Sequence, residues 1–387
     1  LWLLVACQGL FFTNNVTFIA INGLVGLSLA PLGWMATLPV MGYVVGGALS
    51  TSLVARTQKR LGRKMSFQIG LVVGGASSLL CAWAAYSSNF WLLVTATVVA
   101  GYYNANAQLY RFAAAELAAP SAREKAVSLV MAGGLIGAIA GPNLAAATKS
   151  LTTVPFAGAY FSLALVAVLG MVVMSFIKFP PAPPKTNAGG GRPLSEIVRQ
   201  PTFIIAAGAG ALSYGVMNLL MAATPLAMQT CGLPFSDAAL VLQWHVIGMF
   251  APGFFTGHLI KRLGTLKVMT AGLVLNIACV LVAVAGVDLH HFEIALFLLG
   301  VGWNFLFTAS TALSLSTYRP EERDKAQGAL NFCVFAVMAV SSFASGVLVT
   351  SQGWTLLNLG SLLPLGVTAA GLAWLALNRR STPMAGA

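Results

Sequence analysis

The chain has 387 residues, of which 58% are hydrophobic and only 8% are charged. Because soluble domains carry about a quarter charged residues, this composition excludes a fold whose surface is covered by water. The net charge of +12 would suit a protein that binds nucleic acid, but the placement of the basic residues, described below, argues against that partner.

Apolar runs of about 20 residues recur along the chain and predict an all-α integral membrane protein that has the lipid bilayer as its partner. The runs lack the alternating pattern of a membrane barrel, so strands are excluded as spans. The first run exceeds the apolar core of a signal peptide and shows no cleavage pattern, so we interpret it as a span. Because the chain begins at Leu1 rather than Met, we expect a few residues to precede it. The twelve predicted spans cover residues 2–22, 33–55, 66–86, 91–117, 125–148, 155–177, 202–224, 237–259, 267–286, 293–317, 325–349 and 355–377.

Basic residues gather in every second connection between these spans. Nineteen Lys and Arg residues lie there or after the last span, Lys149 lies on the other side and Arg111 lies inside a span, which accounts for all 21. The positive-inside rule then predicts that both termini are cytoplasmic. We expect a monomer in a bacterial inner membrane.

The long polar connection KFPPAPPKTNAGGGRPLSEIVRQP, residues 178–201, changes from Pro-rich to Gly-rich. This composition predicts an extended, mobile cytoplasmic linker. Its end, RPLSEIVRQ, either forms a short amphipathic helix on the membrane surface or remains a tether. The linker separates six spans from six, so we expect an N-terminal bundle (1–178), the linker (179–201) and a C-terminal bundle (202–387).

Short motifs recur at an offset of 200 or 202 residues. The matches are PSAREKAVS at 120–128 with PEERDKAQG at 320–328, KRLG at 59–62 with KRLG at 261–264, and Tyr103-Asn104 with Trp303-Asn304. Two six-helix halves in parallel orientation, joined by a linker, are the repeat design of one large class of transporters.

The chain resembles the major facilitator superfamily over essentially its whole length. The family signature after the second span, roughly G-x-x-x-D-R-x-G-R-R/K, is matched at Gly62, Arg63 and Lys64, whereas Ala55 replaces the first glycine and Lys59 the acid. This resemblance implies twelve helices in two halves related by a pseudo-twofold axis, and secondary transport by alternating access.

The second copy of that signature keeps Gly257 and Gly264 and again places a lysine, Lys261, at the acidic position. In the family this acid anchors a charge network between the halves, so a different network is expected here. GAIAGP, residues 137–142, resembles the helix 5 signature of antiporters, but without its trailing glycines. QWHVIGMFAPGFFTG, residues 243–257, resembles a bacterial subgroup that includes proposed riboflavin transporters.

Polar residues on spans 1, 4, 7 and 10 are candidates for substrate binding, because the resemblance places these spans around the central path. Several recur at spacings of four and seven residues, which puts them on one helix face. The alternative is that these amides and hydroxyls join helices by hydrogen bonds. The candidates are Asn15, Asn104, Gln108, Arg111, Tyr214, Asn218, Trp303, Asn304 and Thr308.

Ionisable residues inside spans are costly and therefore candidates for function. We expect Glu116, near the cytoplasmic end of its span, to be a gate residue that pairs with Arg63 or Arg123, with proton transfer as the alternative. His245 is either a hydrogen-bonded structural residue or a proton carrier. Arg111 has no carboxylate at its depth, so its charge meets either Glu116 or a bound ligand.

No acidic residue lies in the middle of a predicted span. Glu116 comes nearest, and it lies close to the inner face of the membrane. A cavity without carboxylates favours a neutral or anionic small organic solute, and a flavin fits this description, as do many aromatic acids. We expect a proton-coupled secondary transporter, with an efflux antiporter or an uncoupled facilitator as alternatives.

Other classes of protein find no support in the motifs. The chain contains no HExxH, GxSxG or P-loop motif, so we expect neither an enzyme, a metal site nor a cofactor. The five cysteines show no paired spacing and are interpreted as packing residues.

The charge pattern can be tested by labelling single cysteines from either side of the membrane. In a background without native cysteines, we expect Gly190→Cys to react only from the cytoplasm and Asp288→Cys only from outside. The reason is that the two positions flank an odd number of predicted spans. If both cysteines react from the same side, the twelve-span topology is wrong.

Overall fold

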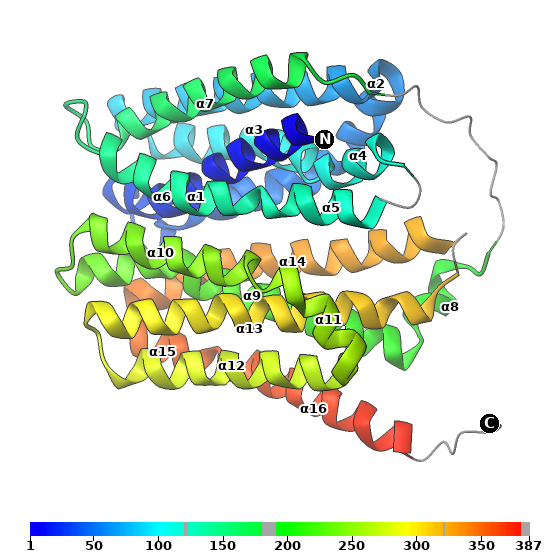
Figure 1. Ribbon diagram of the computed structural model, residues 1–387. Helices are drawn as coiled ribbons and strands as arrows, with labels where there is room; N and C mark the ends of the chain where they lie inside the picture. Colours follow the sequence, from blue (N-terminus) through cyan, green and yellow to red (C-terminus); the bar gives the residue numbers. More distant parts are fainter. Residues whose placement is uncertain (120–122, 180–190, 320–321, 381–387) are drawn as a thin grey trace.

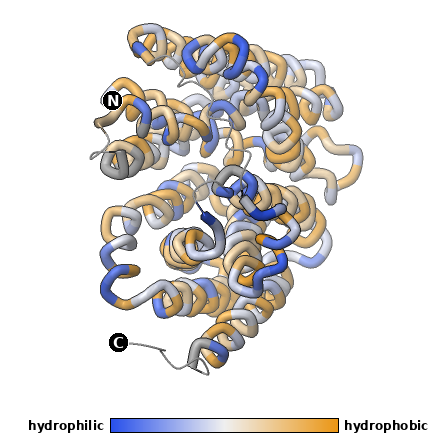
Figure 2. The backbone as a smooth tube through the Cα atoms, turned by 90° about the vertical axis from the view of Figure 1, so that its right-hand side faces the viewer, coloured by the Kyte–Doolittle hydropathy of each residue, from blue (hydrophilic) through white to orange (hydrophobic). Residues whose placement is uncertain are grey.

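The computed structural model describes residues 1–119, 123–179, 191–319 and 322–380, and the regular elements within these ranges are all helices. The helices run roughly parallel and form two bundles, one above the other in Figure 1. Viewed along the helices, the same two bundles again lie one above the other (Figure 2). Most spans are apolar around their whole circumference, which is typical of helices buried in protein or lipid. The predicted all-α architecture of two halves is confirmed.

Each bundle is continuous in sequence. The N-terminal bundle contains α1 (Trp2–Leu29), η1 (Gly33–Met35), α2 (Leu38–Tyr86), α3 (Phe90–Ala107), α4 (Tyr110–Leu117), α5 (Arg123–Ala132), α6 (Gly134–Thr148) and α7 (Ala157–Ser175). The C-terminal bundle contains α9 (Pro201–Thr230), α10 (Phe235–Phe250), α11 (Gly253–Leu263), α12 (Thr265–Ala285), α13 (Leu289–Ser314), η3 (Leu315–Thr317), α14 (Arg323–Ser351), α15 (Gly353–Gly360) and α16 (Leu362–Arg380).

The predicted spans correspond to these helices, several of which are interrupted. Nine helices in the described part are long and apolar enough to cross a membrane, and α10 with α11, bent by 41°, makes ten. Two predicted spans lie together in the segment Gly33–Tyr86, and the fourth is divided between α3 and α4. Each of the twelve predicted spans therefore has a helical counterpart.

Two glycines of the sequence repeat turn the chain from one span into the next. Gly62, inside α2, has φ +79°, and Gly264, between α11 and α12, has φ +87°. Only glycine adopts such a positive φ without strain. Both copies of KRLG therefore end in the residue that their turn requires, which supports the internal repeat.

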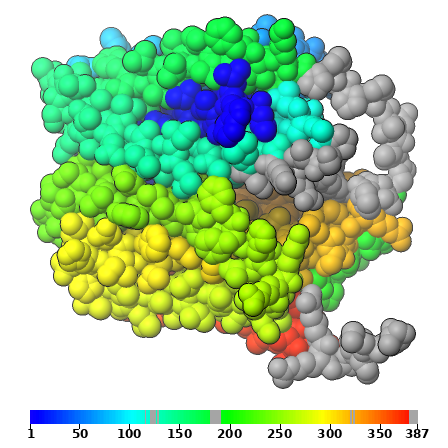
Figure 3. Space-filling model, in the orientation of Figure 1, coloured from blue at the N-terminus to red at the C-terminus, as the bar shows by residue number. Residues whose placement is uncertain are grey.

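The two ends of the molecule differ in how the bundles meet. We call the end that holds the α13–α14 connection and the C-terminus the basic end, and the end that holds η1 and the α6–α7 and α9–α10 connections the opposite end (Figure 1). At the basic end the surface is hollowed between the bundles, and α14 is visible at the floor of the hollow (Figure 3). Toward the opposite end the bundles meet closely in this view.

Hydrogen bonds between the bundles lie near the opposite end. Among the described residues, Thr37 Oγ1 donates to the carbonyl of Ser342 at 2.7 Å, and Asn143 Nδ2 donates to Gln243 Oε1 at 2.7 Å. The rings of Trp34 and Phe343 also meet there, with centroids 5.8 Å apart. The structure is therefore closed at the opposite end and open at the basic end.

The last part of the connection between the bundles is packed against the C-terminal bundle. It forms the short helix α8 (Leu194–Val198), and its Ile197 is fully buried in a cluster with Phe203 of α9 and Leu330 of α14. Of the two possibilities for RPLSEIVRQ, the short helix is the one that forms. The predicted mobile stretch at residues 180–190 lies outside the described residues.

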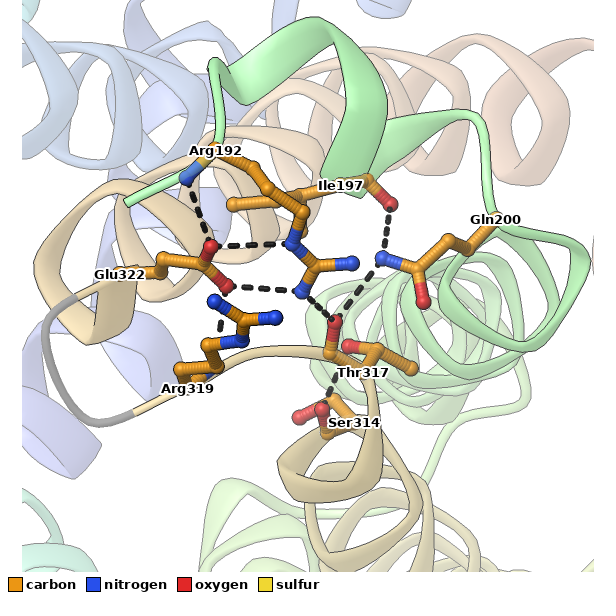
Figure 4. Close-up of polar contacts among 7 residues, drawn as sticks. All are labelled: Arg192, Ile197, Gln200, Ser314, Thr317, Arg319 and Glu322. Atoms are coloured by element: carbon orange, nitrogen blue, oxygen red, sulfur yellow. Dashed lines mark hydrogen bonds and ion pairs between the residues drawn. The ribbon is translucent and has the colours of Figure 1, made fainter. Parts of the chain in front are cut away.

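One buried carboxylate anchors this segment (Figure 4). The fully buried Glu322 accepts hydrogen bonds from Nε, Nη2 and the backbone N–H of Arg192 at 2.9, 2.8 and 2.7 Å. The backbone N–H of Arg319 donates to the same carboxylate at 3.0 Å. Arg192 and Gln200 also donate to the carbonyl of Thr317, at 3.1 and 2.9 Å. We call these five residues the linker clasp.

The clasp lowers the pKa of the Glu322 carboxyl far below its ordinary value of 4.5. The main cause is the hydrogen-bonded Arg192 guanidinium, followed by the backbone N–H of Arg319. A carboxyl whose pKa is lowered by folding stabilises the protein fully above its unfolded pKa, and this contribution is lost as the pH falls toward the folded pKa. In the sequence repeat the position of Glu322 is occupied by Ala122, so the first copy cannot supply this carboxylate.

The linker clasp predicts that the stability of the folded protein depends on pH, and that replacing Glu322 removes this dependence. We expect Glu322→Gln to lower the midpoint of thermal unfolding at pH 7, because it leaves Arg192 without its carboxylate. The wild-type midpoint should fall as the pH drops below about 4.5, and the variant should lose that part of the dependence. Glu196→Gln, at an exposed position on α8, is the matched control and should behave like the wild type. An unchanged midpoint for Glu322→Gln at pH 7 would contradict a stabilising role.

Candidate functional site

A cavity of about 210 Å³ lies between the bundles and is lined by both. α1 to α5 contribute from the N-terminal bundle, and α9, α10, α13 and α14 contribute from the C-terminal bundle. The predicted substrate-binding residues that line it are Asn15, Asn104, Gln108, Arg111, Tyr214, Asn218 and Trp303. The structure thus gathers polar residues from all four spans in which the sequence predicted them.

Aromatic rings form the wall on the side of the C-terminal bundle. Trp303 and Phe307, one helical turn apart on α13, are stacked with ring centroids 5.2 Å apart and an angle of 9° between their planes. Tyr214 of α9 meets both rings edge to face, at 5.2 and 5.3 Å. The contacts hold all three rings in fixed orientations, so this wall can receive a flat ligand by stacking.

Four buried polar atoms of the lining residues have no hydrogen-bond partner in the described part of the chain. They are the hydroxyl of Tyr43, Oδ1 of Asn104, Nε of Arg111 and Nε1 of Trp303. A polar atom left buried and unpaired costs about 1–3 kcal/mol. The set contains two N–H donors, one carbonyl acceptor and one hydroxyl, so a ligand that offers both acceptors and donors would pair with it.

Arg111 is the charged group of this cavity. A break between α3 and α4, at Gln108 and Leu109, precedes it, and its guanidinium carbon lies 4.9 Å from the ring centroid of Phe112. Glu116, one of the two partners proposed for Arg111, is paired with Arg63 instead. Among the described residues no carboxylate pairs with Arg111, so its charge is directed to the cavity.

Two asparagines among the predicted substrate-binding residues already have hydrogen-bond partners within the protein. Asn218 Nδ2 donates to Ser341 Oγ at 2.9 Å and to Ser342 Oγ at 2.7 Å, which joins α9 to α14. Asn304 Nδ2 donates to the carbonyl of Met249 at 2.7 Å, and its Oδ1 accepts from Thr256 at 2.7 Å. Asn218 still reaches the cavity, but Asn304 and Thr308 do not line it. Asn304 therefore joins helices by hydrogen bonds, which is the alternative to substrate binding given for these residues.

The predicted gate and coupling residues lie away from the cavity wall. Glu116 accepts a hydrogen bond from Arg63 at the basic end, and both side chains are partly exposed. Its role as a gate residue stays a prediction. Arg123 begins α5, but its side chain lies outside the described part. His245 is fully buried, and its Nδ1 lies 2.7 Å from the carbonyl of Leu296. Since a carbonyl only accepts, Nδ1 carries the proton. Nε2 is buried and has no hydrogen-bond partner among the described residues.

Several lining residues were not predicted from the sequence, because they lie outside the four spans that the family resemblance places around the central path. Tyr43 comes from α2, and Asn331, Phe335 and Met338 come from α14. Asn331 is the repeat partner of Met131, and both line the cavity.

Comparison with known proteins indicates the family to which this chain belongs. The family model of the Major Facilitator Superfamily matches residues 1–242 and 206–386. The riboflavin transporter RfnT of Brucella anthropi is 39% identical over 361 residues, which cover 92% of this chain and 90% of that protein. The MFS-type transporter YdeG of Bacillus subtilis is 28% identical over 365 residues, covering 90% and 85%.

A solved structure shares the fold. It is a bacterial homologue of the human lysosomal transporter Spinster, described as inward-facing and unoccupied. The TM-score is 0.68 at 16% identity, and the match covers 96% of this chain and 95% of that one.

Proposed function

The chain belongs to the major facilitator superfamily and is a multi-pass integral membrane transporter, and from this premise we propose that it carries a flavin-type solute by alternating access. The observation that carries the proposal is the cavity between the bundles, which combines a fixed aromatic wall with four unpaired polar atoms. A flavin has a flat ring system to stack on the wall and carbonyl and N–H groups at its edge to pair with those atoms. The similarity to a riboflavin transporter supports this choice.

The charge of the cavity favours a neutral or anionic solute. Arg111 is the one charged side chain among the described residues that line it. A buried guanidinium is stable only where acceptors or a counter-charge satisfy it. A conjugated carbonyl, carboxylate or phosphate can accept its hydrogen bonds, whereas a cationic solute would be repelled.

Alternating access is supported by the difference between the two ends. The bundles are hydrogen-bonded to each other near the opposite end and hollowed apart at the basic end. With the basic end placed in the cytoplasm by the positive-inside rule, the conformation is open to the cytoplasm. We place the protein as a monomer in a bacterial inner membrane with both termini cytoplasmic.

We further propose that transport is coupled to protons. Of the two candidate proton carriers, Glu116 and His245, Glu116 is the better one. It is partly exposed at the open end and pairs with Arg63 of the family signature, so its protonation would release that pair. His245 lies outside the cavity and is tied to the backbone of Leu296. The lack of an acid among the described lining residues favours the uncoupled facilitator as the second candidate.

The first test is riboflavin binding by purified protein in detergent, where no gradient exists. We expect Arg111→Lys to raise the dissociation constant about tenfold to a hundredfold, because hydrogen bonds to charged groups contribute about 1.5–3 kcal/mol and lysine lacks the planar fork. Asn104→Ala should cost less, about 1 kcal/mol.

Asn304→Ala is the matched control, since this residue is the repeat partner of Asn104 but has its partners in Met249 and Thr256. It should lower the thermal unfolding midpoint and leave the dissociation constant of the folded protein unchanged. No saturable riboflavin binding to the wild type would overturn the proposed substrate. Unchanged affinity in Arg111→Lys would remove Arg111 from the site.

Coupling is tested by riboflavin uptake into cells or proteoliposomes. If protons drive uptake, a protonophore should abolish accumulation, and Glu116→Gln should do the same while counterflow exchange, which needs no gradient, continues. Uptake that is indifferent to the protonophore and to an imposed pH gradient would identify the protein as a facilitator.

A further inference from the structure

A second cavity lies between the bundles at the opposite end. Its volume is about 410 Å³. It is lined from the N-terminal bundle by α1, the end of α2 and the α6–α7 connection, and from the C-terminal bundle by α9, the α9–α10 connection and the start of α10. The end that the hydrogen bonds close is therefore not packed solid.

The one ammonium group at this end sits beside two rings of this cavity. The Nζ atom of Lys149 lies 5.5 Å from the ring centroid of Phe156 and 5.5 Å from that of Phe235. Both distances are within the range of a cation–π interaction. Phe156 belongs to the same bundle as Lys149, whereas Phe235 is the first residue of α10 in the other bundle. The lysine thus bridges the two halves.

The loop that presents this lysine is tightly folded. The backbone N–H of Phe156 donates to the carbonyl of Lys149 at 2.9 Å, which closes the loop from 149 to 156. Phe156 has φ +64°, a conformation that a bulky residue keeps only where its surroundings hold it. Its ring also meets the ring of Phe235 edge to face, with centroids 5.0 Å apart. Lys149 and Phe156 therefore form a preformed bracket for a ring of the other bundle.

Charge pairing does not account for the position of Lys149. No carboxylate forms an ion pair with it among the described residues, although three acids, Asp237, Asp288 and Glu293, belong to this end. The contacts that the structure gives its ammonium are the two aromatic faces.

We propose that Lys149 and Phe156 form a latch that holds the opposite end closed by gripping Phe235 across the bundle interface. This inference rests on the proposed alternating access. It adds a contact that stabilises the closed state at the end away from the substrate cavity. When the opposite end opens, Phe235 moves away with α10 and the contact between Lys149 and Phe235 breaks. The contact between Lys149 and Phe156 remains, because both residues belong to one bundle. The latch therefore favours the closed state by one cation–π contact and one ring pair.

The latch can be tested by measuring the distance between its two sides. Spin labels are attached at Leu151→Cys, on the exposed part of the α6–α7 connection, and at the native Cys231, which is exposed at the end of α9, with the other four cysteines replaced. Electron–electron resonance then reports the populations of closed (short) and open (long) distances in lipid nanodiscs without solute. We expect Lys149→Met to raise the ratio of open to closed about two- to fivefold, which corresponds to the strength of one partly exposed cation–π contact.

Lys149→Arg is the matched control, because a guanidinium keeps the cation–π contact, and it should leave the distance distribution close to that of the wild type. Phe235→Leu, which removes the ring and keeps an apolar side chain, should shift the ratio at least as far as Lys149→Met. In its presence Lys149→Met should have little further effect, because both act on one contact.

Three results would overturn the latch: an unchanged distribution in Lys149→Met, an equal shift in Lys149→Arg, or independent, additive shifts in the double variant. The measurement uses no solute, so a failure of the proposed flavin binding would appear in the riboflavin titration and leave this outcome separate. Thermal unfolding of each variant confirms that the fold is intact.

Discussion

Every polar group that this chain buries among its spans must find a partner inside the protein, because hydrocarbon offers none. The helices meet this constraint for the backbone, and side chains such as Asn218, Asn304 and Thr37 meet it by joining neighbouring helices. The exceptions are therefore informative. Of the fourteen unpaired buried side-chain atoms in the described part of the chain, four belong to residues that line one cavity, between the two halves, which is where a solute could complete them.

The strong and the weak polar contacts are distributed differently. The charge-assisted pair of Arg63 with Glu116 lies within the N-terminal half, and that of Arg192 with Glu322 joins the linker to the C-terminal half. The hydrogen bonds between the halves involve neutral groups, Thr37 with a backbone carbonyl and Asn143 with Gln243. Charge-assisted hydrogen bonds are roughly twice as strong as neutral ones. Among the described residues, the hydrogen bonds that join the two halves are thus of the weaker, neutral kind.

Much of this architecture could be predicted from the sequence, because hydrophobic length and charge placement act locally. The spans and the two halves follow from such patterns, and Arg63 is one of the two partners that the sequence predicted for Glu116. The roles of Asn104 and Asn304 could not be told apart in this way. They are equivalent in the repeat, and only the neighbours Met249 and Thr256, brought together by the fold, satisfy the second amide. The burial of Glu322 could likewise not be predicted, because it depends on Arg192, which the fold brings to it from the linker.

The linker clasp also changes how far the two halves can move apart at the basic end. From Phe179 to Pro201 there are 22 chain steps, which would reach at most about 75 Å when fully extended. With Arg192 fixed to the C-terminal half, 13 chain steps separate Phe179 from the clasp, and the greatest reach of 13 steps is about 45 Å. The clasp therefore works as a shortened tether: whatever path the intervening residues follow, the basic ends cannot swing beyond this radius while the ion pair holds.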